Sequence, residues 1–135
     1  MHVSAADDSS SLLPITARQA QTFPGTEQKE TIEVSTVTLD ERFPDGVEEP
    51  ALLKIDVQGY ELEVLRGAER LLQTIGTVLV ECSFQEFYAG QAGADEVIRF
   101  LQQRGFRLAG GTAPTVDRHG VLLQVDLIFN REVGG

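Results

Sequence analysis

The stretch Ala51–Gly67, which reads ALLKIDVQGYELEVLRG, constrains the fold of this chain more than any other. Its apolar run Leu52–Ile55 predicts a buried strand. Gly59 then permits a sharp backbone turn, and from Glu61 onward the apolar positions recur at helical spacing. Because ligand crevices form outside the carboxyl ends of strands in open α/β sheets, Asp56 is expected at a position suited to chemistry.

The residues that follow predict one more round of the same pattern and then two strands joined by a loop. A β-branched run, Thr77–Val80, predicts a second strand, which ends in Glu81. Asp95 is expected to cap the next helix, and Gly105 to end it. We expect the last elements to be a strand, a long polar loop and a final strand over Phe106–Ala109, Gly110–Gly120 and Val121–Asn130.

This order of elements predicts the fold class. Strands that alternate with helices require a mainly parallel sheet, whereas two strands joined by a loop favour an antiparallel arrangement. We therefore expect an α/β fold with a mainly parallel sheet and an antiparallel edge strand. A chain of 135 residues fits a single unit, with the α/β core over residues 31–135.

The first part of the chain has a different character. Serines, prolines and charged residues predict irregular structure over residues 1–30, and the imperfect alternation of Thr31–Leu39 predicts a strand. Residues 1–50 contain only two isolated glycines, Gly25 and Gly46. A glycine-rich turn of the GxG type, whose bare backbone approaches a nucleotide cofactor, is therefore not found there.

Two stretches together resemble the C-terminal half of the FkbM-type methyltransferases: KIDVQGYELEVLRGAERLL over residues 54–72 and VLVECSF over residues 78–84. The upstream stretches DDSSSLL and VSTVTLDE also look like the family's pattern, so the resemblance covers nearly the whole chain. It implies a Rossmann-like, class I methyltransferase fold. It also implies an enzyme that uses S-adenosylmethionine to methylate a hydroxyl group of a sugar, a polyketide or a similar small metabolite.

The resemblance further implies that residues 1–135 are the C-terminal part of a single methyltransferase domain, and that its N-terminal cofactor-binding strands are missing. S-adenosylmethionine is then the cofactor of the complete domain, and no cofactor-binding residue is assigned in this chain. A non-catalytic remnant or interaction module of the same fold is the alternative. A hydrolase that uses two carboxylates and a metal ion is disfavoured, because the chain lacks a DxDxT pattern.

Two acids are the candidate catalytic residues. Asp56 and Glu81 follow neighbouring strands, so we expect their carboxylates to face one shared crevice. In the resembled enzymes Asp56 would hold the acceptor hydroxyl near the methyl group, as orienting group or general base. The structural alternative is that Asp56 only caps the turn before the helix.

Four further residues have proposed roles. Glu61 is a candidate substrate-binding residue, although glutamates are common in first helical turns for electrostatic reasons alone. Ser10 and Ser11 are candidates on the acceptor side through the resemblance, whereas serines in such a cluster usually form a solvated turn or cap. Gly59 is expected to be the structural turn.

Composition argues against other classes of function. The net charge of −10 opposes nucleic-acid binding, and no apolar run approaches the roughly 18 residues that span a membrane. The start of the chain lacks the features of a signal peptide, so the cytoplasm is the expected location. A single cysteine, Cys82, precludes an internal disulfide and is expected to be a buried strand residue. His2 and His119 are isolated, no GxSxG elbow occurs, and no metal site is predicted.

The expected sheet has one exposed edge. In the complete fold the strand before Asp56 would lie beside the first strand, so here its edge would present unpaired amides and carbonyls. We expect either that Thr31–Leu39 folds over this edge or that another copy of the chain pairs with it, giving a homo-oligomer.

Overall fold

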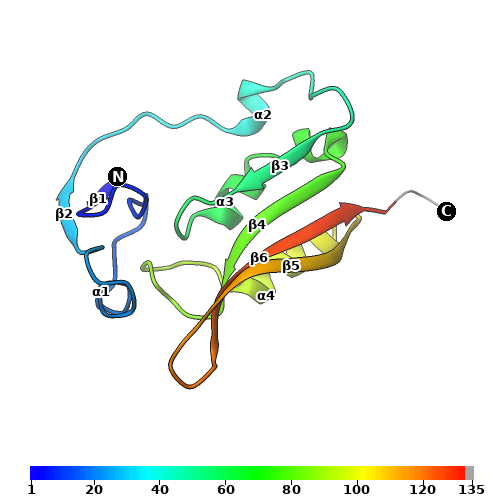
Figure 1. Ribbon diagram of the computed structural model, residues 1–135. Coiled ribbons are helices and arrows are strands. Elements are labelled where there is room, and N and C mark those ends of the chain that lie inside the picture. Colours follow the sequence, from blue (N-terminus) through cyan, green and yellow to red (C-terminus); the bar gives the residue numbers. More distant parts are fainter. Residues whose placement is uncertain (133–135) are drawn as a thin grey trace.

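The computed structural model describes residues 1–132 (Figure 1). Within these residues six strands form two sheets, and four α-helices and one 3-10 helix accompany them. The larger sheet has the order β3-β4-β6-β5, with β3 at Leu52–Ile55, β4 at Thr77–Ser83, β5 at Phe106–Val116 and β6 at Leu122–Arg131. The smaller sheet pairs β1, His2–Ser4, with β2, Gln28–Thr31. The helices are α1 at Ala17–Thr22, α2 at Leu39–Arg42, α3 at Glu61–Arg66, η1 at Leu71–Thr74 and α4 at Ala94–Gln102.

The directions of the strands confirm part of the predicted fold class. Strand β3 is parallel to β4, and β6 is antiparallel to both β4 and β5. Three strands therefore run one way, but β3 and β4 are the one parallel pair of neighbours among them, so the sheet is mixed and not mainly parallel. The prediction of an antiparallel pair at the edge of the sheet is confirmed, because the edge strand β5 pairs with β6 in antiparallel direction.

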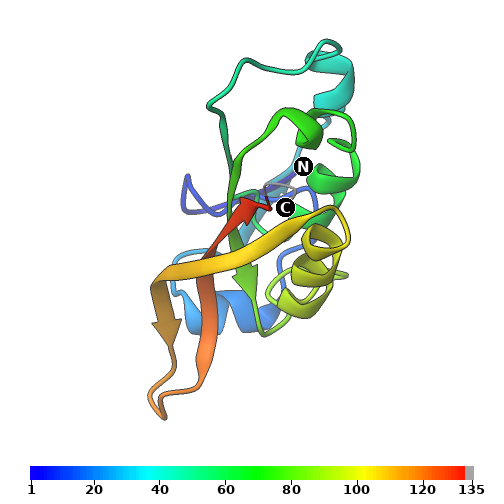
Figure 2. The same cartoon turned by 90° about the vertical axis from the view of Figure 1, so that its right-hand side faces the viewer.

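One face of the larger sheet holds the core. Figure 2 shows the green and yellow-green helices on the same side of the strands. The buried residues alternate along β4 and β6, as a sheet with one covered face requires. They pack with apolar residues of α3 and α4: Ile55, Val78, Val80, Val125, Leu127 and Phe129 against Leu62, Leu65, Val97 and Leu101. The residues between them, among them Lys54, Leu79, Glu81 and Asp126, belong to the opposite face.

Residues 1–31 form a small N-terminal module, not the irregular segment that the sequence suggested. Its two strands and α1 lie beside the loops that follow β3 and β4 (Figure 1). Leu13, Ile15 and Phe23 of the module pack against a second apolar cluster of Phe87, Tyr88 and Leu123. The module therefore covers the carboxyl-end side of the sheet, where the candidate residues were expected.

The strand predicted over Thr31–Leu39 is wrong. The chain leaves β2 at Thr31, crosses without regular structure through residues 32–38, and enters α2 at Leu39. Thr38 caps that short helix, because its Oγ1 accepts from the Glu41 amide at 3.1 Å while Glu41 Oε2 accepts from the Thr38 amide at 2.9 Å. The apolar alternation therefore belongs to an exposed connection, which we call the connecting segment (residues 32–38).

Other boundaries shift for local reasons. The helix that begins at Glu61 ends at Arg66, and η1 carries the apolar stripe onward through Leu71 and Leu72. Helix α4 is capped at Gly93, whose amide donates to Glu96 Oε2 at 3.0 Å, so Asp95 lies within the first turn. The polar loop predicted over Gly110–Gly120 is wrong for its first seven residues, because β5 continues through register shifts to Val116. None of the described helices is long and apolar enough to cross a membrane.

Candidate active site at the carboxyl ends of β3 and β4

Asp56 and Glu81 lie on neighbouring strands. The register pairs Ile55 with Val80, so the next residues, Asp56 and Glu81, lie opposite each other on the face away from the helices. Glu81 does not end its strand as the sequence suggested, because β4 continues to Ser83. Asp56 is exposed and follows β3 directly, whereas Glu81 is half-buried.

The surroundings of Glu81 favour its neutral form. Burial is the main cause, and the negative charges of Asp56, Glu61 and Asp126 add to it. Together they raise the pKa of Glu81 to about 7. A carboxyl group with such a pKa can accept or release a proton near neutrality, which an ordinary glutamate cannot do efficiently.

A chain of hydrogen bonds fixes the carboxylate of Asp56. Gln58 Nε2 donates to Asp56 Oδ1 at 2.8 Å, and the hydroxyl of Tyr88 donates to Gln58 Oε1 at 2.7 Å. The Tyr88 hydroxyl also lies 3.1 Å from the carbonyl oxygen of Ser9 in the N-terminal module. Sequence reasoning missed Gln58 and Tyr88; the signal for Gln58 was its place within the DVQG turn.

Gly59 is the turn residue that the sequence predicted. Its φ is +98°, and a Cβ at this position would lie 2.9 Å from Cβ of Tyr88. Both observations require glycine, because side chains disfavour that φ and the tyrosine leaves no space. The turn therefore brings the backbone against Tyr88 and places Gln58 between that ring and Asp56.

Glu61 is buried beneath the same turn. Its Oε1 accepts from the amides of Val57 at 3.3 Å and Gly59 at 3.1 Å. Burial raises the pKa of Glu61 despite these hydrogen bonds, and the charge of Asp56 raises it further. The observed contacts of Glu61 stabilise the turn, and its role in substrate binding stays a prediction.

The two candidate serines make contacts inside the protein. Ser11 is buried, and its Oγ donates to the carbonyl oxygen of Gln58 at 2.6 Å and accepts from the Leu13 amide at 3.0 Å. Ser10 Oγ accepts from the amide of Ser4 at 3.1 Å. Ser11 thus connects the N-terminal module to the turn after β3, and the substrate roles of both serines stay predictions.

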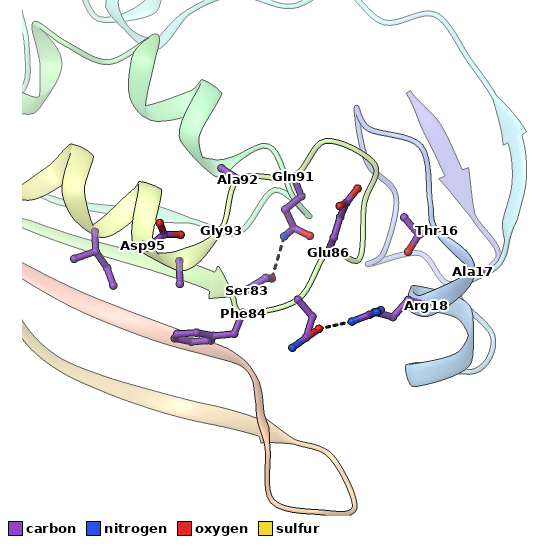
Figure 3. A pocket seen from close by; sticks show the side chains of 13 residues that line it. Thr16, Ala17, Arg18, Ser83, Phe84, Glu86, Gln91, Ala92, Gly93 and Asp95 are labelled. Atoms are coloured by element: carbon purple, nitrogen blue, oxygen red, sulfur yellow. Dashed lines mark hydrogen bonds between the residues drawn. The ribbon is translucent and has the colours of Figure 1, made fainter.

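A cavity of about 770 Å³ opens beyond the end of β4 (Figure 3). Ser83 and Phe84, the first residues of α4 and the start of α1 line it. Arg18 is the one cation among its described lining residues, and the Arg18 guanidinium donates to Gln85 Oε1. Ser83 Oγ accepts from Gln91 Nε2 at 2.9 Å, as Figure 3 shows.

Glu81 is connected to this cavity through Ser83. Gln124 Nε2 lies 3.1 Å from Glu81 Oε1 and 3.2 Å from Ser83 Oγ. One amide thus holds the half-buried carboxyl group and the cavity-lining hydroxyl together. Neither Asp56 nor Glu81 lines the cavity itself.

The remaining reactive side chains lie outside this arrangement. Cys82 is buried in the core, and burial raises the pKa of its thiol to about 12, so the thiol stays protonated. His2 contacts Gln28 in the small sheet, and His119 accepts from Arg118 Nε in the β5–β6 turn. Within residues 1–132, no three histidine, cysteine or acidic side chains are arranged to hold a metal ion.

Comparisons with known proteins give two matches. The family model described as the methyltransferase FkbM domain matches residues 1–108. A hexuronic acid methyltransferase, AglP, from Haloferax volcanii is 43% identical over 49 residues, which are 36% of this chain and 20% of that protein. The chain thus matches about a fifth of the length of this curated relative. No solved structure matches the chain.

Proposed function

The chain belongs to the FkbM methyltransferase domain family, and we propose that it forms the acceptor-binding part of an S-adenosylmethionine-dependent O-methyltransferase. The acceptor would be a hydroxyl group of a sugar or similar small metabolite. One observation carries this proposal. Asp56 and the half-buried Glu81, with a pKa of about 7, lie side by side at the carboxyl ends of two parallel strands. The α/β sheet is consistent with part of a Rossmann-like methyltransferase fold.

The residues present fit the acceptor and not the cofactor. S-adenosylmethionine would supply the methyl group, but residues 1–50 contain no glycine-rich turn for the backbone to approach it. No step is therefore assigned to the cofactor in this chain. The expected cytoplasmic location stays a prediction.

The proposed chemistry is deprotonation and orientation of a hydroxyl group. Asp56, held by Gln58, accepts a hydrogen bond from the hydroxyl and fixes its direction. Glu81 takes the proton as the oxygen becomes nucleophilic, because its raised pKa matches neutral conditions better than that of an exposed glutamate. A bound S-adenosylmethionine would supply the carbon to which this oxygen bonds, and the bond from that carbon to sulfur would break, with S-adenosylhomocysteine as the leaving group.

The cavity and the relative support one class of acceptor. AglP is named as a hexuronic acid methyltransferase, and a hexuronic acid carries several hydroxyl groups and one carboxylate. Arg18 lies at the cavity and can form a bidentate pair with a carboxylate. We therefore propose a sugar acid as acceptor, with Arg18 as the residue that distinguishes it from a neutral sugar.

The test combines binding and transfer. The protein is titrated calorimetrically with S-adenosylmethionine, with glucuronic acid and with glucose, and methyl transfer is followed by mass spectrometry. We expect binding of glucuronic acid, a loss of about tenfold in its affinity in Arg18→Gln, and no change for glucose. If transfer occurs, Asp56→Asn should slow it by about 10²-fold or more.

The alternative function is a non-catalytic interaction module of the same fold, favoured by the lack of a glycine-rich turn in residues 1–50. This alternative predicts no heat of binding in the calorimetric titrations with S-adenosylmethionine and with the sugar acid. Binding of the sugar acid without binding of S-adenosylmethionine would support the acceptor role and assign cofactor binding to other residues. No binding of either compound would overturn the proposed function.

A further inference from the structure

The hydroxyl group of Ser83, at the end of β4, is buried but lies beside a cavity. Ser83 is only 3% exposed, and its Oγ accepts from Gln91 Nε2 at 2.9 Å and from Gln124 Nε2 at 3.2 Å. These two bonds occupy both lone pairs of the oxygen, so the hydroxyl proton remains to be donated. Among residues 1–132, no acceptor takes this proton. An oxygen atom of a ligand in the adjoining cavity would satisfy this buried donor.

The two glutamines cannot take the proton in their observed orientations. Gln91 Oε1 accepts from two backbone amides of the loop after β4, at 3.0 and 3.3 Å, so its NH₂ group faces Ser83 (Figure 3). Gln124 also presents its NH₂ group, because the same nitrogen lies 3.1 Å from Glu81 Oε1. Both neighbours are therefore donors, and the hydroxyl proton of Ser83 is left to a group in the cavity.

Phe84, the next residue, is the most exposed phenylalanine of the described residues, at 44%. Its amide donates to the carbonyl oxygen of Leu123 at 2.9 Å, so strand pairing holds its backbone beside the cavity. Each of the other six phenylalanines contacts an aromatic ring or an arginine, or is buried in the core: Phe23 with Phe87, Phe43 with Arg42, Phe100 with Arg104, Phe106 with Arg131, and Phe129. Within residues 1–132, Phe84 has no such contact, so its ring is free to pack against a ligand.

The cavity has one apolar and one polar wall. Three aliphatic residues join Phe84 in the apolar wall: Ala92, Ala94 and Ile98. Ser83 and Arg18 belong to the polar wall. A pyranose ring has the same two-sided character, because its hydroxyl groups project from its edge and its faces carry C–H bonds. In Figure 3 the side chains of Ser83 and Phe84 leave the end of β4 in different directions, so a ring over this end can meet the hydroxyl with its edge and the phenyl group with one face.

We propose that Ser83 and Phe84 are sugar-binding residues. Ser83 donates its hydroxyl proton to a hydroxyl oxygen of the acceptor, and the Phe84 ring packs against a C–H face of the pyranose. This inference rests on the proposed function, because it takes the acceptor to be a sugar. It adds two residues that select a sugar ring to Arg18, which selects a carboxylate. Because Gln124 contacts both Ser83 and Glu81, a ring bound at Ser83 lies next to the amide that holds Glu81.

The role of Phe84 is tested with a ring and with an open chain. Phe84→Ala should weaken the binding of glucuronic acid by about tenfold in calorimetry, but should leave that of gluconic acid unchanged, because this open-chain acid has no ring face. Phe84→Trp keeps an aromatic face and should keep the affinity. Since the chain contains no tryptophan, the emission of this single reporter should also change saturably with glucuronic acid. Phe43→Ala, at a phenylalanine that is 38% exposed outside the cavity, is the matched control and should leave both affinities unchanged.

The role of Ser83 is tested with deoxy derivatives of glucuronic acid that each lack one ring hydroxyl. Ser83→Ala should weaken the binding of glucuronic acid by about tenfold. It should bind one of the derivatives as tightly as the unaltered protein does, because that derivative lacks the oxygen that Ser83 contacts. A purely structural role of the hydroxyl would weaken the binding of every derivative alike. Circular dichroism verifies that each variant is folded.

Unchanged affinities in both Phe84→Ala and Ser83→Ala would overturn the inference. Equal losses for all deoxy derivatives, or for the ring and the open-chain acid, would also overturn it. The proposed function survives these outcomes if Arg18→Gln still weakens binding and methyl transfer proceeds. Conversely, a protein that shows the Ser83 and Phe84 effects but neither binds S-adenosylmethionine nor transfers a methyl group would retain the sugar site and lose the proposed function.

Discussion

At the residue scale, the contact between Gly59 and Tyr88 packs the turn after β3 against the loop after β4, and the Tyr88 hydroxyl extends this contact to the N-terminal module. Gly59 leaves space for the ring, and the ring's hydroxyl reaches both Gln58 and Ser9. One small residue therefore determines how closely two parts of the chain approach each other at the candidate site.

Gly59→Ala should be strongly destabilising. The left-handed backbone costs an alanine about 1–2 kcal/mol, and the contact with Tyr88 adds about 1–3 kcal/mol of overpacking. Gly25→Ala is the matched control, because its φ of +91° is similar and nothing lies within 4 Å of the added Cβ. Urea unfolding of both variants isolates the contact with the ring. Equal losses of stability would show that the ring moves aside at no cost.

Glu81 should make stability depend on pH. Its pKa is raised to about 7 from the ordinary 4.5, so the folded state binds more protons than the unfolded state between these values. Stability therefore falls as pH rises from about 4.5 to about 7, by about 1–2 kcal/mol once solvent screening of this half-buried group is taken into account.

Glu81→Gln should remove most of this slope. The amide oxygen can still accept from Gln124, and no charge is buried at high pH. Denaturation at pH 5, 6, 7 and 8 measures the effect, with the exposed Glu33→Gln as control for net charge. A slope that persists in Glu81→Gln would assign it to another group.

The sequence predicted the pairing of Asp56 with Glu81 because parallel neighbours end at the same edge of a sheet. It could not predict that Tyr88 and Gln58 fix Asp56. Those contacts join residues far apart in the chain, and they depend on how the loops after β3 and β4 pack. The place of Glu61 beneath the turn was likewise not visible, because a glutamate in a first helical turn is common for electrostatic reasons alone.

At the scale of elements, one aspartate ties α2 to the start of η1. Asp40 Oδ1 accepts from the amide of Leu71 at 2.8 Å, and Asp40 Oδ2 accepts from that of Arg70 at 3.0 Å. Partial burial opposes ionisation, but these hydrogen bonds and the Arg70 charge dominate and lower the pKa of Asp40. This short helix is thus attached to the core by hydrogen bonds to a carboxylate.

Asp40→Ala should lower the free energy of unfolding by about 1–2 kcal/mol at pH 7, because two amides lose their acceptor. The lowered pKa means that the contribution is present above the unfolded pKa near 4 and is lost as pH falls below it. The variant and the protein should therefore converge near pH 2. Asp45→Ala, an exposed aspartate in the following turn, is the control in the same denaturation series.

The elements that the sequence predicted correctly, such as β4 and α4, have strong periodicity, although the ends of both differ from the prediction by two residues. The strand prediction over Thr31–Leu39 failed because β-branched residues also occur in extended connections that pair with no neighbouring strand. The loop prediction over Gly110–Gly120 failed in the opposite way, since much of it is strand. Strand β5 tolerates glycines there because it lies at the edge of the sheet and its register shifts. In both segments the structure depends on strand pairing, and the propensities of single residues carry no information about which strands pair.

At the scale of the whole molecule, residues 1–31 pack against a small apolar cluster that is separate from the larger core cluster of the four-stranded sheet. The smaller cluster and a few hydrogen bonds attach the module, so it should open before the sheet does. Native-state hydrogen exchange should show lower opening free energies for β1 and β2 than for β4 and β6.

Tyr88→Phe should increase the difference in opening free energy between the strands of the module, β1 and β2, and the central strands β4 and β6. It removes the hydroxyl that donates to Gln58 and lies beside the Ser9 carbonyl oxygen, at a cost of about 1–2 kcal/mol. Tyr60→Phe is the control, because it removes the hydroxyl of the other tyrosine, next to the same turn. If both variants leave exchange in β1 and β2 unchanged, the module is held by other contacts.

The α/β class was predictable at this scale because alternating strands and helices allow few topologies. The position of β6 was not, since a loop between two strands predicts their direction but not which further strand they join. That position has a consequence for synthesis. The ribosome makes β6 last of the four strands, at about 5–20 residues per second, yet β4 and β5 meet only through it. Until Arg131 has emerged, the nascent chain leaves the backbone of β4 unpaired on the side that β6 will occupy, and molecular chaperones have their best opportunity to bind it.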